Sequence, residues 1–289
     1  MFFYIWKNFN LMNRLLIILA IVMTSPLVFA QQKEKVKGSK IVKVVQKEIT
    51  EFQTLETKDN LEIFLIKGDR SLLEIEADDN VIEYIEYSVK GNTLYLSTSR
   101  QISGTKKLSV RITYTDNFNL LIAKDDSNIT ALAEINLPDF TFKINDNARL
   151  YAYANVKNFT LMLDDKSKAE LNLKSESATI ELSKFGQLKA LIASTAMKFD
   201  MYQKTKAVVE GDVINFKLRL DNDADFTGAK LTARNAELLT EGFAECSINV
   251  ATKLILDAKG KSETRLFGTQ KLEIKNFLDS AVLSKKPTK

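Results

Sequence analysis

Apolar and polar residues alternate in short runs from Leu120 to the end of the chain, and the runs recur about every nineteen residues. Small or polar residues that we place in turns mark nine copies of this unit. They are Ser127, Ala148, Ser167, Gly186, Thr205, Asn222, Ala244, Ser262 and Ser280. Their separations are 21, 19, 19, 19, 17, 22, 18 and 18 residues. Self-similarity at such a period predicts a repeat architecture in which successive copies stack.

Each copy carries an apolar residue six positions before its turn residue. This column consists of Leu121, Phe142, Leu161, Ile180, Phe199, Phe216, Leu238, Leu256 and Ile274. Charged residues such as Lys143, Glu181 and Asp200 follow the column directly, so the period is two and the run is a β-strand. A second alternating run follows each turn. Its inward positions are Ala131, Ala152, Leu171, Ala190, Val209, Phe226, Ile248 and Leu266.

These units predict an all-β protein, a right-handed parallel β-helix (β-solenoid) of about nine coils over residues 117–285, with a tail at 286–289. One unit cannot bury its apolar side alone, whereas coils about 4.8 Å apart share a continuous core. Residues 49–116 are expected to form a β-rich cap, because an end coil leaves an open sheet edge. Within the cap we predict strands at 61–66, 72–77, 93–97 and 108–113, and a short helix at 79–87 capped by Asp79 or Asn80.

The first thirty residues differ from the rest of the chain. Two basic residues precede an apolar run at 15–22, and Val28-Phe29-Ala30 resembles a cleavage site, so we predict a secretory signal at 1–30 that starts at Met1 or Met12. The alternative is an uncleaved anchor, but the run is shorter than the roughly 20 residues of a membrane span. We therefore expect a periplasmic or cell-surface protein without a transmembrane span, in which residues 31–48 form a polar tether and a first strand.

Charge and composition exclude several functions. Without residues 1–30 the chain has 39 basic residues and 37 acidic residues, and the two signs alternate without forming a basic stripe, which argues against nucleic acid as a partner. The chain has no histidine, which removes Ser-His-Asp triads and most zinc sites. The single cysteine, Cys246, falls at an inward position and is expected to be a buried apolar side chain.

The order of motifs before the repeats resembles the putative auto-transporter adhesin, head GIN domain family. The segments that carry the resemblance are Phe52-Gln53-Thr54-Leu55, Leu61-Glu62-Ile63-Phe64-Leu65-Ile66-Lys67-Gly68-Asp69, Leu73-Glu74-Ile75-Glu76-Ala77-Asp78 and Lys90-Gly91-Asn92-Thr93-Leu94-Tyr95-Leu96, followed by short coils. The resemblance spans about Thr50 to Leu283. It implies a secreted or surface β-helical protein of Bacteroidetes-type bacteria, without catalytic residues. The turns depart from the family's Gly-Ser pattern, for example at Asp126-Ser127-Asn128, which puts in doubt any ligand contact made there.

Acidic residues form the first candidate site. Asp125, Asp146 and Asp165 stand two residues before the turn residue in three consecutive copies. Stacked carboxylates about 5 Å apart repel, and calcium would relieve that repulsion; no other cofactor is expected. The alternative is that aspartate suits turns because its side chain bonds to nearby backbone.

A second acidic motif and an enzyme alternative involve the sixth copy. Asp221, Asp223 and Asp225 begin like a calcium loop, but Phe226 and Thr232 occupy the positions of the required glycine and glutamate, which favours a solvated strand. Arg219 and Lys217 beside these aspartates could serve a polysaccharide lyase. The turns are too short to wall a substrate groove, so we expect no enzyme.

Tyr151 and Tyr153 flank the inward Ala152 and are the candidate ligand-binding residues, because outward tyrosines stack on a sugar or pack on a protein. They could equally cover a neighbouring loop. The sequence therefore favours an adhesin-like or scaffolding module whose partner is a cell-surface or extracellular protein or glycan. The alternatives are a calcium-dependent or carbohydrate-binding periplasmic protein and, third, a polysaccharide-active enzyme.

Overall fold

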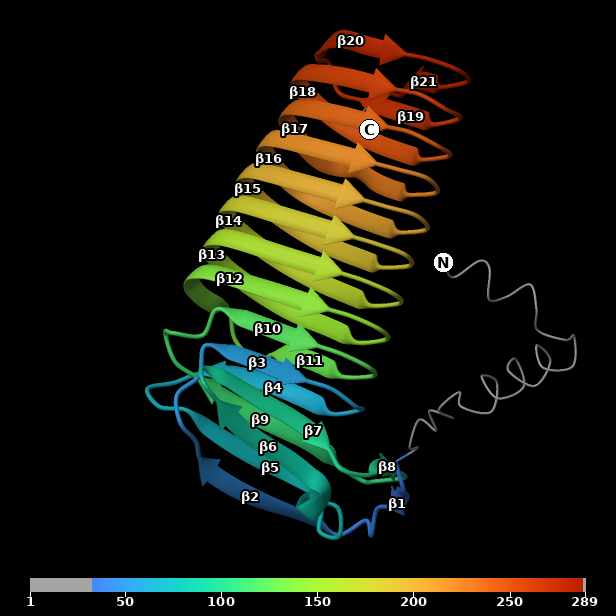
Figure 1. The fold of residues 1–289 in the computed structure, drawn as a ribbon. Coiled ribbons are helices and arrows are strands. Elements are labelled where there is room, and N and C mark those ends of the chain that lie inside the picture. The colour runs from blue at the N-terminus through green and yellow to red at the C-terminus, as the bar shows by residue number, and fades with distance from the viewer. Residues whose placement is uncertain (1–32, 288–289) are drawn as a thin grey trace, which may run out of the picture. The chain divides into compact units, whose positions relative to one another are not determined.

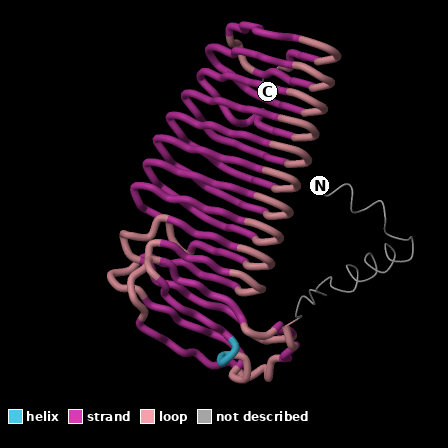
Figure 2. Tube along the Cα trace, viewed as in Figure 1, coloured by secondary structure: helices cyan, strands magenta, loops and turns pink. Residues whose placement is uncertain are grey.

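The structure, a computed structural model, describes residues 33–287, and the predicted signal at 1–30 lies outside the described residues. Strands dominate it, and in the described chain the only helical segment is the 3-10 turn η2 (Ile82–Tyr84). Stacked coils fill most of the fold (Figures 1 and 2). The predicted β-solenoid is confirmed; its right-handed sense stays a prediction.

Long strands build the coils. Their bounds are β10 (Leu120–Ala123), β11 (Asn128–Ala131), β12 (Ile135–Ile144), β13 (Arg149–Leu163), β14 (Lys168–Leu182), β15 (Gln187–Met201), β16 (Lys206–Leu220), β17 (Asp225–Thr240), β18 (Glu245–Ala258), β19 (Glu263–Phe267), β20 (Lys271–Phe277) and β21 (Val282–Lys285). Neighbouring coils pair in parallel, and pairing between β13 and β14 is interrupted at Lys157 and Glu176. Each long strand bends there (Figure 2), which folds one continuous sheet into two layers. The first halves of the strands form one layer (the first sheet), and the second halves form the other (the second sheet).

The core lies between the two sheets. Phe142 pairs with Leu161 and Leu161 pairs with Ile180, and all three side chains are fully buried. The predicted column of stacked apolar residues is therefore confirmed over these coils. Burial of each such side chain contributes about 2 kcal/mol, so the stack is held by its apolar core.

The sixth coil corrects the predicted register. Phe199 pairs with Leu218 instead of Phe216, and the small buried turn residue is Ala224 instead of Asn222. An extra residue in β20 between Ile274 and Asn276 separately moves the last turn residue from Ser280 to Ala281. Phe226 shifts with the sixth coil and pairs with Cys246 instead of joining the column of Ile248. The physical reason is that strand alternation has period two, so a slip of two residues still points an apolar side chain inward.

The turns share one backbone conformation. A residue with positive φ occupies the second turn position in every stacked coil. These residues are Asp59, Asp125, Asp146, Asp165, Lys184, Gln203, Asn222, Gly242, Gly260 and Asp279. Asparagine, aspartate and glycine tolerate the left-handed region best, which explains most of the column.

The segment before the repeats closes the N-terminal end of the stack. Its strands are β1 (Lys35–Lys37), β2 (Val42–Glu48), β3 (Thr54–Thr57), β4 (Glu62–Lys67), β5 (Leu72–Asp78), β6 (Ile85–Lys90), β7 (Thr93–Thr98), β8 (Gln101–Ser103) and β9 (Leu108–Tyr114). β3 and β4 pair in parallel with β10 and β11, and on their other side in parallel with β7 and β9, so the parallel stack begins inside this segment. Beyond it, β6 pairs antiparallel with β7, and β5 and β2 continue antiparallel from β9. Parallel pairing thus ends where the chain reverses into these antiparallel pairs. Strands occur in all four predicted regions of the cap.

Buried aromatic rings join this segment to the first coils. Phe118 lies 5.5 Å from Phe52 and 5.0 Å from Phe140, measured between ring centroids, and both pairs meet edge to face. Phe142 continues the series 4.7 Å from Phe140. Edge-to-face pairs add about 0.5 to 1.5 kcal/mol each beyond the area they bury.

The predicted helix at 79–87 is wrong. A single 3-10 turn replaces it, and β6 begins at Ile85. Asp79 does not cap a helix, because its carboxylate accepts a hydrogen bond from the Ser39 hydroxyl at 2.6 Å. Asn80 likewise donates to the Lys37 carbonyl at 2.9 Å. Both side chains hold down the segment around β1, a strand within the residues expected to form a polar tether.

Candidate functional site

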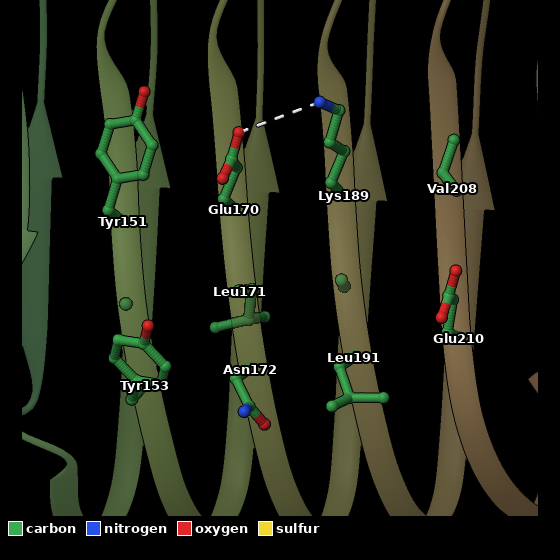
Figure 3. Close-up of a pocket in the computed structure, with 11 residues that line it drawn as sticks. Tyr151, Tyr153, Glu170, Leu171, Asn172, Lys189, Leu191, Val208 and Glu210 are labelled. Atoms are coloured by element: carbon green, nitrogen blue, oxygen red, sulfur yellow. Dashed lines mark ion pairs between the residues drawn. The ribbon is translucent and has the colours of Figure 1, made fainter.

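Tyr151 and Tyr153 lie side by side on β13 and point outward from the first sheet (Figure 3). Six outward residues on the next three strands complete a surface that we call the tyrosine floor. The floor consists of Tyr151, Tyr153, Glu170, Asn172, Lys189, Leu191, Val208 and Glu210. It lines a shallow groove of about 410 Å³ that Ala152, Leu171 and Ala190 also border.

The floor is apolar for an exposed sheet surface. Tyr153 is 57% exposed, Leu191 50% and Val208 44%, while Ala152 between the tyrosines is buried. Strand alternation forces this arrangement, because each inward residue of the core column turns its neighbours to solvent. Exposed apolar residues that gather in one place, rather than singly, mark interaction sites.

Insertions border the floor on both sides. The coil that precedes β13 has two extra residues, and Leu132 in this insertion is exposed. On the other side β17 carries a bulge, since Val208 pairs with Thr227 but Gly211 pairs with Leu231. Between the insertions β13, β14, β15 and β16 stack in unbroken register apart from the common bend. The irregular coils therefore delimit a flat platform four strands wide.

Charges on the floor are paired in place. Lys189 Nζ lies 4.0 Å from Glu170 Oε1, the ion pair drawn in Figure 3. Lys230 in the β17 bulge lies 2.9 Å from Glu210 Oε1. Two carboxylates are thus matched by two ammonium groups, so the groove offers aromatic rings, apolar side chains and the Asn172 amide without net charge.

The predicted calcium ligands stack in one column, but as turn residues. Asp125, Asp146 and Asp165 have φ of 56°, 57° and 57°. The N–H of Asp59 donates to Asp125 Oδ2 at 3.0 Å, and the N–H of Asp125 donates to Asp146 Oδ2 at 2.9 Å. Within residues 33–287 no group of three acidic or cysteine side chains is arranged to hold a metal ion. Calcium binding stays a prediction, in competition with these backbone hydrogen bonds.

Lys184 pairs with the last aspartates of this column. Its Nζ lies 3.0 Å from Asp164 Oδ2 and 2.8 Å from Asp165 Oδ1. Partial burial opposes ionisation of Asp164, but hydrogen bonds from Ser183, the Asp165 N–H and Lys184 outweigh it and lower the pKa of this carboxyl. Hydrogen bonds to Asp165 and Asp164 raise the pKa of Lys184. The Lys184 ammonium group therefore faces both carboxylates of this turn.

The residues considered for a lyase lie on the second sheet and its turn, away from the floor. Arg219 Nη2 lies 3.5 Å from both Asp221 Oδ2 and Glu241 Oε1, and Lys217 Nζ lies 3.5 Å from Glu237 Oε2. Asp225 begins β17, with Phe226 buried beside it, as the predicted solvated strand requires, whereas Asp223 lies in the turn before β17 and not on a strand. The arrangement is a surface network of ion pairs along a groove of about 220 Å³.

Cys246 is buried in the core. Burial raises the pKa of its thiol well above the ordinary value, which keeps it protonated and unreactive. No helix long and apolar enough to cross a bilayer occurs in the part of the chain that the structure describes.

Sequence reasoning identified the tyrosines but missed their neighbours. Leu191 and Val208 belong to the same groove, although they lie 38 and 57 residues beyond Tyr153 and Tyr151. A signal was available, because both are apolar residues at outward positions of strands whose other outward residues are mostly polar or charged. Only the stacking of coils shows that these positions adjoin.

Comparisons with known proteins agree with this fold. Solved structures described as putative adhesins from Parabacteroides distasonis (TM-score 0.67, 11% identity) and Parabacteroides merdae (TM-score 0.61, 13% identity) each match 88% of this chain, over 100% and 98% of their own lengths. A putative lipid binding protein from Parabacteroides distasonis matches with a TM-score of 0.55 and 12% identity, over 88% of this chain and 100% of its own. At such identities the likeness is one of fold.

No curated protein sequence is significantly similar to the chain. The sequence model described as putative auto-transporter adhesin, head GIN domain, matches residues 51–190 and 166–269, which is most of the chain. The resemblance seen in the N-terminal motifs is confirmed, and the chain belongs to this family.

Proposed function

We propose that the protein is exported and acts outside the inner membrane as an adhesin-like binding module, with the tyrosine floor as its contact surface. The observation that carries this proposal is the gathering of Tyr151, Tyr153, Leu191 and Val208 on one exposed sheet surface between two insertions. Adhesin is also how the family and two of the similar structures are described.

The groove geometry favours binding over catalysis. The floor is shallow, and its carboxylates are paired with lysines instead of with each other. General acid–base chemistry depends on groups whose pKa values are driven apart in a site that excludes water, and a flat open sheet supplies neither. A surface module whose partner docks on a rigid sheet accounts for the same residues.

Surface display tests the proposal. The full chain is displayed on a non-adherent bacterium, and attachment to an epithelial cell layer is counted. Displayed protein should raise attachment, and Tyr153→Lys combined with Leu191→Lys should abolish the increase, because two ammonium groups would lose hydration against a partner that offers no opposite charge.

Met162→Lys is the matched control. Met162 is an exposed apolar residue of the same strand, but it belongs to the second sheet. Attachment should survive this change. Display that adds no attachment contradicts the adhesin function, while equal attachment by both variants places the contact surface elsewhere.

A further inference from the structure

Resting on the proposed function, the floor also indicates the chemical class of its ligand. We propose that the tyrosine floor binds a short, uncharged oligosaccharide laid across strands β13 to β16. Three properties of the floor lead to this ligand: its size, its charge balance and the chemistry of its exposed groups.

The floor is too small to form a complete interface with a protein partner. Four strands about 4.8 Å apart span about 14 Å, and two outward residues on one strand lie about 7 Å apart. The floor therefore offers on the order of 100 Å², whereas a stable protein interface covers about 800 Å² on each partner. A few sugar rings match the platform, and the insertions at Leu132 and Lys230 limit its length.

The charge balance selects an uncharged ligand. Glu170 is matched by Lys189 at 4.0 Å, and Glu210 is matched by Lys230 at 2.9 Å. An acidic polysaccharide would need ammonium groups that these carboxylates already engage. A cationic ligand would need carboxylates, and Glu170 and Glu210 are already paired with lysines. Within the floor neither charge gains a free partner, so a neutral chain loses least there. Arg149, Lys168 and Lys206 stand one outward row beyond the floor on the same strands, and only a ligand longer than the floor would reach them.

The exposed groups suit the two sides of a sugar. Tyr151 and Tyr153 present ring surfaces for the C–H face of a pyranose and hydroxyls for its polar edge. Asn172 beside Tyr153 adds an amide that both donates and accepts. Leu191 and Val208 extend the apolar surface on the following strands, so consecutive sugar rings would meet rings first and aliphatic side chains next.

An array of defined oligosaccharides tests this inference with the purified full chain. The probes are neutral oligosaccharides of glucose, mannose, galactose, xylose and N-acetylglucosamine, and acidic oligosaccharides of galacturonate and heparin. The expected result is binding to at least one neutral probe that does not weaken when salt rises to about 0.5 M, because screening acts on charges alone. Absence of binding to every neutral probe, or binding to acidic probes only, overturns the inference.

Substitutions identify the surface. Tyr153→Ala should weaken binding of the neutral probe about tenfold, Tyr153→Phe should keep it within about threefold, and Met162→Ala on the second sheet should leave it unchanged. Circular dichroism verifies that each variant is folded. Equal binding by Tyr153→Ala and the unaltered chain overturns the assignment of the floor.

Attachment of displaying cells separates this inference from the proposed function. Periodate oxidises the vicinal diols of glycans on the epithelial layer and leaves its polypeptides intact. Loss of attachment after periodate supports the oligosaccharide ligand. Attachment that persists after periodate and glycosidase digestion together overturns the oligosaccharide but leaves the adhesin function standing. Display that never raises attachment defeats the adhesin function itself.

Discussion

Gln203 is an informative position for testing the turn column, because it adopts a left-handed conformation without a side chain suited to it. Its φ is 62°, its side chain is exposed, and it makes no hydrogen bond or ion pair with other residues in 33–287. Lys184 in the preceding turn has a similar φ of 58° but gains ion pairs with two aspartates. Gln203→Gly therefore removes backbone strain and little else.

The expected gain is the difference between two terms. A left-handed residue with a Cβ costs roughly 1 to 2 kcal/mol, and the greater freedom of unfolded glycine costs roughly 0.5 to 1 kcal/mol. Gln203→Gly should stabilise the protein by about 0.5 to 1 kcal/mol. In a chain of this size that corresponds to a rise in melting temperature of roughly 1 to 4 °C.

Lys204→Gly is the matched control in the same turn. Lys204 is also exposed, but its φ is not left-handed and its N–H donates to the Lys184 carbonyl at 2.9 Å, a bond that glycine keeps. This change carries only the entropy cost and should destabilise by about 0.5 to 1 kcal/mol. Urea unfolding followed by circular dichroism measures both. Effects of the same sign in the two variants would refute the argument from backbone conformation.

Three further predictions concern the bulge, the cap and the metal. Gly211→Ala should lower the free energy of unfolding in urea by about 2 kcal/mol or more, since φ is 113° and a Cβ would lie 2.1 Å from the Ile192 carbonyl oxygen. Gly91→Ala is the control and should cost only about 1 kcal/mol, because φ is 57° and no atom lies within 4 Å of the added Cβ. Equal costs for the two variants would contradict the close approach at Gly211. Burial opposes ionisation of Asp78, but hydrogen bonds from the backbone N–H groups of Lys107, Lys40 and Lys106 outweigh this effect and hold the pKa of Asp78 below the ordinary 3.8. The ionised Asp78 therefore contributes to stability above pH 3.8, and this contribution is lost as pH falls through the pKa of the folded state. Asp78→Asn should lower stability at pH 7 and flatten the loss of stability in acid, and an unchanged pH profile would count against this anchor. Addition of about 1 mM calcium should leave the melting temperature unchanged, because the stacked aspartates already bind backbone N–H groups, and a clear rise would instead support the metal prediction.

The repeat pattern predicted the architecture, because apolar residues at inward strand positions recur about every nineteen residues. It did not fix the register of the sixth coil, since Phe216 and Leu218 are both inward and a two-residue slip leaves alternation intact. The order of strands in the N-terminal cap was also beyond the sequence. Pairing of β2 with β5 and of β6 with β7 depends on chain reversals that local patterns do not encode.

The candidate site was predictable only in part. Outward phase on a strand identified Tyr151 and Tyr153, because Ala152 between them had to face the core. Leu191 and Val208 adjoin them through stacking over two and three coils, which requires the register. The paired charges that make the floor neutral depend on the same register and on the β17 bulge.

A disulfide test of that register addresses the central claim most directly. Lys198 and Lys217 are exposed partners on adjacent coils, so Lys198→Cys with Lys217→Cys brings two Cα atoms to about 4.8 Å, within disulfide range. Lys198→Cys with Asn215→Cys represents the two-residue slip and leaves about 8 Å, beyond that range. Oxidation followed by peptide mass mapping should give an intramolecular disulfide in the first variant and free thiols in the second. A disulfide formed readily in the second variant but not in the first would contradict the stacking on which the fold and the tyrosine floor depend.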